Sequence, residues 1–180
     1  MHNGPSLDTH HSVYRERLLE HLLIGELLKY SWLHAEATLE VSQPSIDRSG
    51  HDVVLEANGV TRHVQLKSSS HDASTAVQVV HVGLARKPSG CVVWMRFDRN
   101  SMTLGPFLYF GAEPGHPLPL LDAFKIAKHT RGDKDGVKKE RPNLRVVPLS
   151  RFREIADVPS LYVALFGDVA ERTWGERSDE

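Results

Sequence analysis

The chain has 180 residues, of which 40% are hydrophobic and 25% charged, as is ordinary for a globular domain. Its near balance of 22 Lys and Arg against 23 Asp and Glu excludes a uniformly basic nucleic-acid binder. The single cysteine, Cys91, excludes a disulfide framework, and no apolar run has the length of a membrane span. Without a visible secretory signal, we expect one cytoplasmic domain with no membrane partner.

A long helix is predicted after a flexible tail over residues 1–11. Ser12 is its expected N-cap, and the helix should end near His34. Apolar residues recur on one face at spacings of three and four, namely Leu19, Leu22, Leu23, Leu27, Tyr30 and Leu33. The opposite, polar face is predicted to consist of Arg15, Glu16, Arg17 and Glu20.

Glu26 interrupts the apolar face of this helix. Its neighbours one and two turns away are apolar: Leu22, Leu23, Tyr30 and Leu33. A carboxylate buried there would need a partner, a metal or a proton, because desolvating it alone is costly. In the alternative, Glu26 lies at the edge of the face and reaches water or pairs with Lys29. Periodicity alone favours neither reading.

A β-hairpin is the central prediction for the next segment. Residues 36–43 alternate well enough for a first strand, and two apolar-rich runs, 52–57 and 60–68, then flank Asn58-Gly59. This residue pair is typical of a two-residue type I′ turn, because both positions take positive φ angles. The turn sets a register in which Ala57 faces Val60, Leu55 faces Arg62, Val53 faces Val64, and Asp52 faces Gln65.

The open end of the hairpin gathers three polar side chains. Asp52 and Gln65 are directly opposed, and Lys67 lies one step further along the same face, while Val64 and Leu66 point the other way. In the structural alternative, these polar groups form only a solvated face. His63 shares the face of Gln65 and is a further candidate to contact a substrate, although a packed or exposed histidine is commoner.

The remaining elements alternate between extended and helical segments. Residues 72–87 are predicted to form a short extended piece followed by a helix, and Cys91–Phe97 a buried strand that turns back into Met102–Phe110. Downstream, we expect a loop over 111–119, a short helix or strand over 120–130, a polar loop over 131–143, a strand over 145–148, a short helix capped by Ser150, and another over 160–166.

Asp52 and the tripeptide Gln65-Leu66-Lys67 resemble the active-site motif of the PD-(D/E)XK nuclease superfamily, with Gln where Glu is more common. The predicted order of helix, three strands, helix and strand over residues 12–97 is similar to the core of that family. The resemblance implies an α/β, restriction-endonuclease-like fold: a mixed β-sheet core (αβββαβ) flanked by helices. Residues 12–110 would form the nuclease-like core domain and 111–180 its C-terminal elaboration.

The same resemblance implies metal-dependent hydrolysis of phosphodiester bonds in nucleic acid, with DNA as the expected substrate. Mg²⁺ or Mn²⁺ would be held by Glu26, Asp52, Gln65 and the backbone carbonyl of Leu66, while Lys67 orients water or stabilises developing charge. Gly25-Glu26 matches a Gly-Glu pair often found on the family's first helix. Because Gln65 is neutral, we expect millimolar metal affinity. The alternative function is a non-catalytic module of the same fold that binds nucleic acid or a protein.

A basic segment lies outside the resemblance. Between Lys125 and Arg145 eight Lys or Arg stand against three acids, a local balance of +5. The candidate nucleic-acid-binding residues are Lys125, Lys128, Arg131, Lys134, Lys138, Lys139 and Arg141. In the alternative, these residues belong to a solvated loop without a binding role. One site of this kind addresses one strand, which is compatible with a homodimer.

Overall fold

The computed structural model describes residues 11–36, 38–44, 50–132, 134 and 136–168. Within these residues the helices are α2 (Ser12–His34) and α3 (Val158–Phe166), with the 3₁₀ helices η1 (Val82–Arg86) and η2 (Leu149–Arg151). The strands are β1 (Glu40–Ser42), β2 (Val53–Ala57), β3 (Val60–Ser70), β4 (Val77–His81), β5 (Gly90–Phe97), β6 (Leu104–Gly111), β7 (Lys125–Lys128), β8 (Glu140–Pro148) and β9 (Arg153–Ile155). No helix among these residues is long and apolar enough to cross a bilayer.

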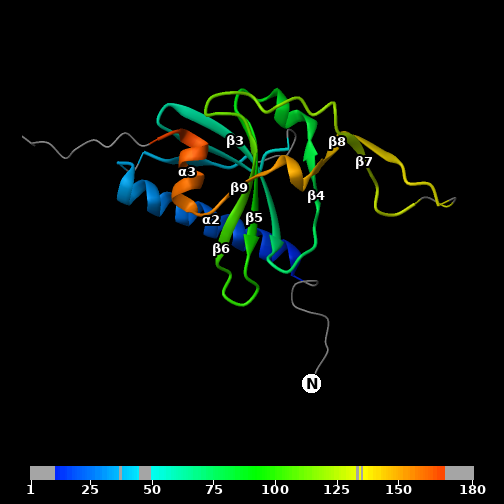
Figure 1. Ribbon diagram of the computed structural model, residues 1–180, viewed down its shortest axis with the longest axis horizontal. Helices are drawn as coiled ribbons and strands as arrows, with labels where there is room; N and C mark the ends of the chain where they lie inside the picture. The colour runs from blue at the N-terminus through cyan, green and yellow to red at the C-terminus, as the bar shows by residue number, and fades with distance from the viewer. Residues whose placement is uncertain (1–10, 37, 45–49, 133, 135, 169–180) are drawn as a thin grey trace, which may run out of the picture.

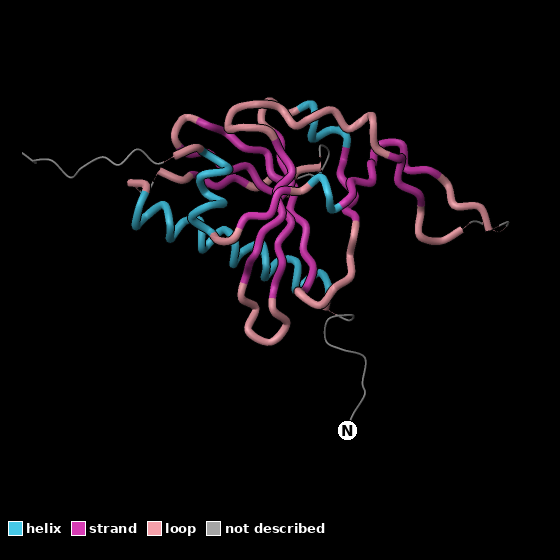
Figure 2. Tube along the Cα trace, in the orientation of Figure 1, coloured by secondary structure: helices cyan, strands magenta, loops and turns pink. Residues whose placement is uncertain are grey.

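Two sheets form the framework of the molecule. The larger has the order β1-β2-β3-β5-β6-β9, and β3 and β5 are its one parallel pair. The smaller sheet has the antiparallel order β4-β8-β7. Because β3 and β5 are parallel, the chain must cross over between them, and it does so through β4 and η1. Figures 1 and 2 show α2 and α3 on one side of the larger sheet and the β7–β8 hairpin extending away from it.

The larger sheet is buried on both faces. Leu19, Leu23 and Leu27 of α2 and Leu161 of α3 belong to the core on one face, and the second core, which contains Val80, Val147 and Phe152, lies on the other. Strand β5 supplies both cores, with Cys91, Val93 and Met95 on the first side and Val92 and Trp94 on the second. This alternation explains why the run CVVWM is continuously apolar.

The structure confirms the predicted hairpin. Asn58 has φ 53° and Gly59 φ 72°, as a type I′ turn requires, and the strand pairs Ala57↔Val60, Leu55↔Arg62 and Val53↔Val64 follow. The long helix also ends where expected, at His34. The mixed α/β class is therefore established, whereas the specific restriction-endonuclease-like fold is still a hypothesis.

Several boundaries differ from the predictions. The helix begins at Ser12, so its N-cap is His11, and the first strand covers only 40–42 within the predicted 36–43. Residues 120–130 contain strand β7, and β8 begins at Glu140, inside the predicted loop. The short helix expected after Ser150 is wrong: residues 149–151 form a 3₁₀ turn, and the edge strand β9 follows it. Short segments of this kind take their form from tertiary pairing, which local pattern does not specify.

Candidate functional site

The hairpin places Asp52 beside the tripeptide 65–67. The regular strand pairs end at Val53↔Val64, so the predicted pair of Asp52 with Gln65 is not among them. Instead, the backbone N–H of Asp52 donates to the carbonyl of Val64 at 2.8 Å. The carboxylate of Asp52 reaches across to β3, where Oδ2 accepts a hydrogen bond from the Leu66 N–H at 2.6 Å. This short bond to backbone fixes the carboxylate at the end of the ladder.

A cavity of about 720 Å³ lies at this end of the hairpin. Asp52, Gln65, Leu66 and Lys67 line it on the sheet side. The first turns of α2 line it on the other side, through Val13, Glu16, Arg17 and Glu20. The hairpin residues predicted for the site therefore line one cavity, and the first turns of α2 line its other side.

Helix α2 contributes two carboxylates to this cavity, the exposed Glu16 and the buried Glu20. The side chain of Glu20 is buried, and its oxygens accept hydrogen bonds from Arg17 Nη1 at 3.2 and 3.3 Å. Gln43 Nε2, from the segment after β1, also donates to Glu20 Oε1. The assignment of Glu20 to the polar face of the helix is therefore wrong. The sequence held a signal, because Leu23 and Leu27 follow Glu20 at i+3 and i+7.

Glu26 is not brought to the other predicted site residues. Its side chain is 47% exposed and pairs with Lys29, Oε2 to Nζ, at 3.3 Å. Six residues of helix put Glu26 about 9 Å further along the axis than Glu20 and about 120° around it. Of the two arrangements predicted for Glu26, the structure therefore has the one in which it lies at the edge of the apolar face and pairs with Lys29. Leu33, predicted on that face, is 60% exposed.

Gln65 is held from the side of the smaller sheet. It is buried, and its Oε1 accepts the backbone N–H of His81 at 3.3 Å. His81 can approach so closely because the residue before His51 is a glycine: a Cβ on Gly50 would lie 2.1 Å from the Cβ of His81, and Gly50 has φ +72°. The contact orients the amide of Gln65 and leaves its oxygen capacity for one further partner.

Two histidines pack against each other at the cavity. The rings of His51, which lines the cavity, and His63 meet edge to face with centroids 5.1 Å apart. Burial, then the Lys87 ammonium and His51, hold the pKa of His63 below its ordinary value. His63 is not among the residues that line the cavity.

The oxygen donors around the cavity suit a hard cation held weakly. No three Asp, Glu, His or Cys side chains in the described ranges cluster as metal ligands. The carboxylates that line the cavity are Asp52, the buried Glu20 and the exposed Glu16, and Gln65 and Leu66 line it beside them. Mg²⁺ is commonly bound through one or two carboxylates with water and substrate phosphate completing its shell. The residues therefore fit Mg²⁺ or Mn²⁺ without forming a closed cage.

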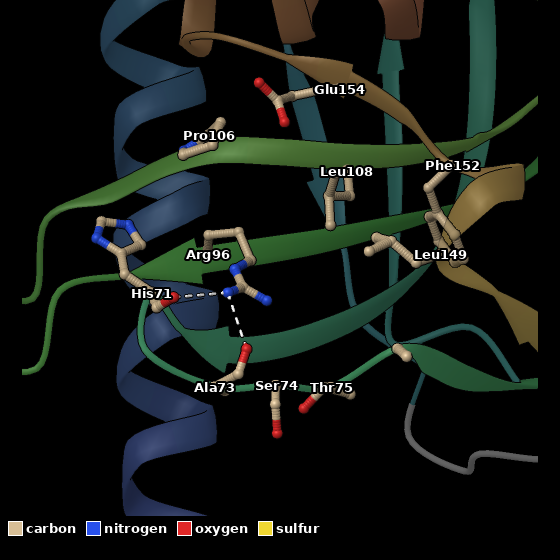
Figure 3. A pocket seen from close by; sticks show the side chains of 11 residues that line it. His71, Ala73, Ser74, Thr75, Arg96, Pro106, Leu108, Leu149, Phe152 and Glu154 are labelled. Atoms are coloured by element: carbon tan, nitrogen blue, oxygen red, sulfur yellow. Dashed lines mark hydrogen bonds between the residues drawn. The ribbon is translucent and has the colours of Figure 1, made fainter.

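A second cavity, of about 610 Å³, lies along the segment between β3 and β4 (Figure 3). Arg96 fixes this segment: its Nη2 donates to the carbonyls of His71 and Ala73 at 2.9 and 3.2 Å, and its Nη1 donates to Ser69 Oγ at 3.0 Å. Ser69 also accepts Trp94 Nε1 at 2.7 Å. Because Ser69 is two residues after Lys67, Arg96 supports the strand that carries the lysine. In the sequence, the signal for this structural role is the position of Arg96 within the otherwise apolar run CVVWMRF.

The seven candidate nucleic-acid-binding residues are all exposed: Lys125, Lys128, Arg131, Lys134, Lys138, Lys139 and Arg141. Those on β7 and β8 belong to the smaller sheet, which reaches the first cavity through β4. Gln78 of β4 lines that cavity and pairs with Val147 of β8. The β7–β8 hairpin, which carries these basic residues, therefore begins next to the candidate site.

Comparison of the chain with protein-family models, with curated proteins and with solved structures finds no match. The case for a function therefore depends on the geometry of this chain: a carboxylate, an amide and an ammonium at the open end of one hairpin, with Glu16 and Glu20 of α2 lining the same cavity.

Proposed function

We propose that the chain hydrolyses phosphodiester bonds of nucleic acid, with DNA as the preferred substrate, in the cavity around Asp52. The observation that carries the proposal is the convergence of Asp52, Gln65 and Lys67 on one cavity, with the Asp52 carboxylate anchored to the Leu66 N–H at 2.6 Å. A carboxylate, neutral oxygens and a cation in one place are what metal-assisted phosphodiester chemistry requires.

Asp52 is the principal anionic donor in this proposal. Glu20 is close to Arg17, whose guanidinium offsets its charge, so its contribution to cation affinity is smaller. The Gln65 amide oxygen and the Leu66 carbonyl add donors without charge. When bound, Mg²⁺ or Mn²⁺ would polarise the phosphate and lower the pKa of an attacking water. With Asp52 as the principal carboxylate, Glu20 partly neutralised and Glu16 exposed to water, we expect affinity in the millimolar range.

In this proposal Lys67 interacts with the phosphate group of the substrate. Its side chain lines the cavity from the same strand face as Gln65. An ammonium there orients the attacking water or stabilises the negative charge that develops on the phosphate oxygens. Arg96 acts as a positioning residue for this strand, because it bonds Ser69 and the two carbonyls that follow.

The substitution Lys67→Ala tests the proposal. We expect it to reduce Mg²⁺-dependent cleavage of a duplex DNA substrate by at least about 100-fold, the scale of loss when a group that stabilises transition-state charge is removed. Metal binding, followed by calorimetry, should persist. The matched control is Lys29→Ala, which removes an exposed lysine that pairs with Glu26 on the far part of α2. Equal cleavage by the Lys67 variant and the wild type would remove the assigned role.

A second function is supported by one observation. The Glu20 carboxylate already has Arg17 and Gln43 as partners, so the site holds together without a cation. The alternative is thus a non-catalytic module of this architecture that binds nucleic acid or a protein. Mn²⁺ binding at Asp52 without hydrolysis of DNA or RNA would select this alternative.

A further inference from the structure

The outer half of the β7–β8 hairpin is a two-stranded ribbon. Strand β4 pairs with β8 from Leu144 to Pro148, so within the described part of the chain residues 140–143 have no third strand beside them. On the other side, Lys128 pairs with Glu140, and the His129 N–H donates to the Lys139 carbonyl at 2.9 Å. We call residues 125–129 and 138–145 the basic ribbon; it comprises this two-stranded part and the adjoining residues at its base, where Leu144 and Arg145 also pair with β4. Figure 1 shows it projecting from the body of the molecule.

Most cationic side chains of the basic ribbon form no ion pair with other described residues. Its residues include six Lys or Arg and one acid, Glu140, a balance of +5. Arg145 has a structural role, because its Nη1 donates to the Pro142 carbonyl at 2.6 Å and its Nη2 is 3.9 Å from Asp122. The other five cations are exposed, and none forms an ion pair with another described residue: Lys125, Lys128, Lys138, Lys139 and Arg141. Five unpaired cations on a narrow projection attract a polyanion.

The shape and composition of the basic ribbon point to a duplex. A two-stranded β-ribbon fits the major groove of B-DNA, about 12 Å wide, whereas the minor groove, about 6 Å wide, is too narrow for it. Proteins that bind single strands usually stack the bases on aromatic side chains. The basic ribbon contains no Phe, Tyr or Trp.

We infer that the basic ribbon enters the major groove of double-stranded DNA and holds the duplex against the cavity around Asp52. The connection is physical, because Gln78 of that cavity pairs with Val147 on the same strand, β8, that continues into the ribbon. The inference rests on the proposed function for the role of the cavity, while binding by the ribbon is measurable without any cleavage.

The test uses the full chain in EDTA, so that no metal-dependent cleavage interferes, and a 25-base-pair fluorescent duplex titrated at several salt concentrations. The variant replaces Lys128, Lys138 and Lys139 by Gln. We expect at least a tenfold loss of affinity near 0.1 M salt and a fall of about 2 to 3 in the slope of log K against log[salt], since each lost phosphate contact contributes about 0.9. The control replaces Lys29, Arg86 and Arg99 by Gln, an equal change in charge on exposed residues outside the ribbon, and should bind as the wild type does.

Two further substrates test the groove. A duplex whose cytosines carry glucosylated hydroxymethyl groups, which fill the major groove, should bind at least tenfold more weakly than the plain duplex. A single strand of the same sequence should also bind more weakly. Equal affinity for the ribbon variant and the wild type, for the blocked and plain duplex, or for single and double strands would overturn the inference.

The outcomes separate this inference from the proposed function. If the ribbon variant binds normally while Lys67-dependent cleavage is observed, the ribbon inference fails and the hydrolytic proposal stands. If binding depends on the ribbon but no metal supports cleavage, the hydrolytic proposal fails and the ribbon inference stands.

Discussion

Arg62 offers the sharpest test of how the fold is held together. It belongs to β3, its side chain is fully buried, and it forms no ion pair with an acid in the described part of the chain. Its partners are backbone carbonyls: Nε donates to Leu165 at 2.7 Å, and Nη2 donates to Ala164 at 3.2 Å and to Ala112 at 3.1 Å. Leu165 and Ala164 lie in the last turn of α3, where carbonyls lack helical donors and the helix dipole favours a cation.

The substitution Arg62→Met removes the donors and keeps much of the side-chain volume. The Ala112 carbonyl retains a bond from Tyr109 Oη at 3.1 Å, so two carbonyls are left without their side-chain donor. Each costs about 1 to 3 kcal/mol when buried without a partner, and relief of the guanidinium's desolvation offsets part of the loss. We therefore expect the free energy of unfolding to fall by about 3 kcal/mol.

The assay is urea unfolding of the full chain followed by far-UV circular dichroism, with the midpoint and the slope fitted together. Arg99→Met is the control, because Arg99 is an exposed residue that pairs with Asp72 at 3.1 Å, and its loss should change stability by less than about 0.5 kcal/mol. An Arg62→Met protein as stable as the wild type would refute the reasoning, since the cost of burying the charge would then equal or exceed the value of its three bonds.

Two other predictions concern carboxylates. Glu20→Gln should weaken Mg²⁺ binding by roughly fivefold, about 1 kcal/mol, because it removes a charge beside the cavity. Glu26→Gln should leave the affinity unchanged, and calorimetry that ranked the two variants the other way would return the metal site to Glu26. Asp157, the N-cap of α3, accepts the Ser160 N–H at 2.9 Å. The Ser160 hydroxyl, and after it this backbone bond, hold the pKa of Asp157 below its usual value. Its contribution to stability is therefore complete above the unfolded pKa near 3.8 and is lost as the pH falls through the lower folded pKa. Asp157→Ala should cost about 1 kcal/mol near pH 7, measured by urea unfolding, and the difference from wild type should vanish in acid.

The hairpin could be predicted from the amino acids alone. Asn58-Gly59 adopts the positive φ angles of one tight turn, and this turn fixes which residues of the two strands oppose each other. Because side chains alternate along a strand, Gln65 and Lys67 lie on one face of β3. The predicted pair of Asp52 with Gln65 is absent from the strand pairs, and Asp52 reaches β3 through the Leu66 N–H. The buried character of β5 was likewise visible in its continuous apolar run.

Only the tertiary structure decided which helix carboxylate joins the hairpin. Glu20 and Glu26 both have apolar neighbours at helical spacing, so periodicity cannot rank them; the angle and depth at which α2 packs on the sheet put Glu20 at the cavity and leave Glu26 exposed beside Lys29. The pairing of β4 with β8 and the two-stranded projection beyond it also depend on contacts between residues more than sixty positions apart. Neighbouring residues determine a turn and the face on which each side chain of a strand or helix lies, so local sequence predicts both. Which face of a helix packs on the sheet depends on contacts between elements that are distant in the sequence.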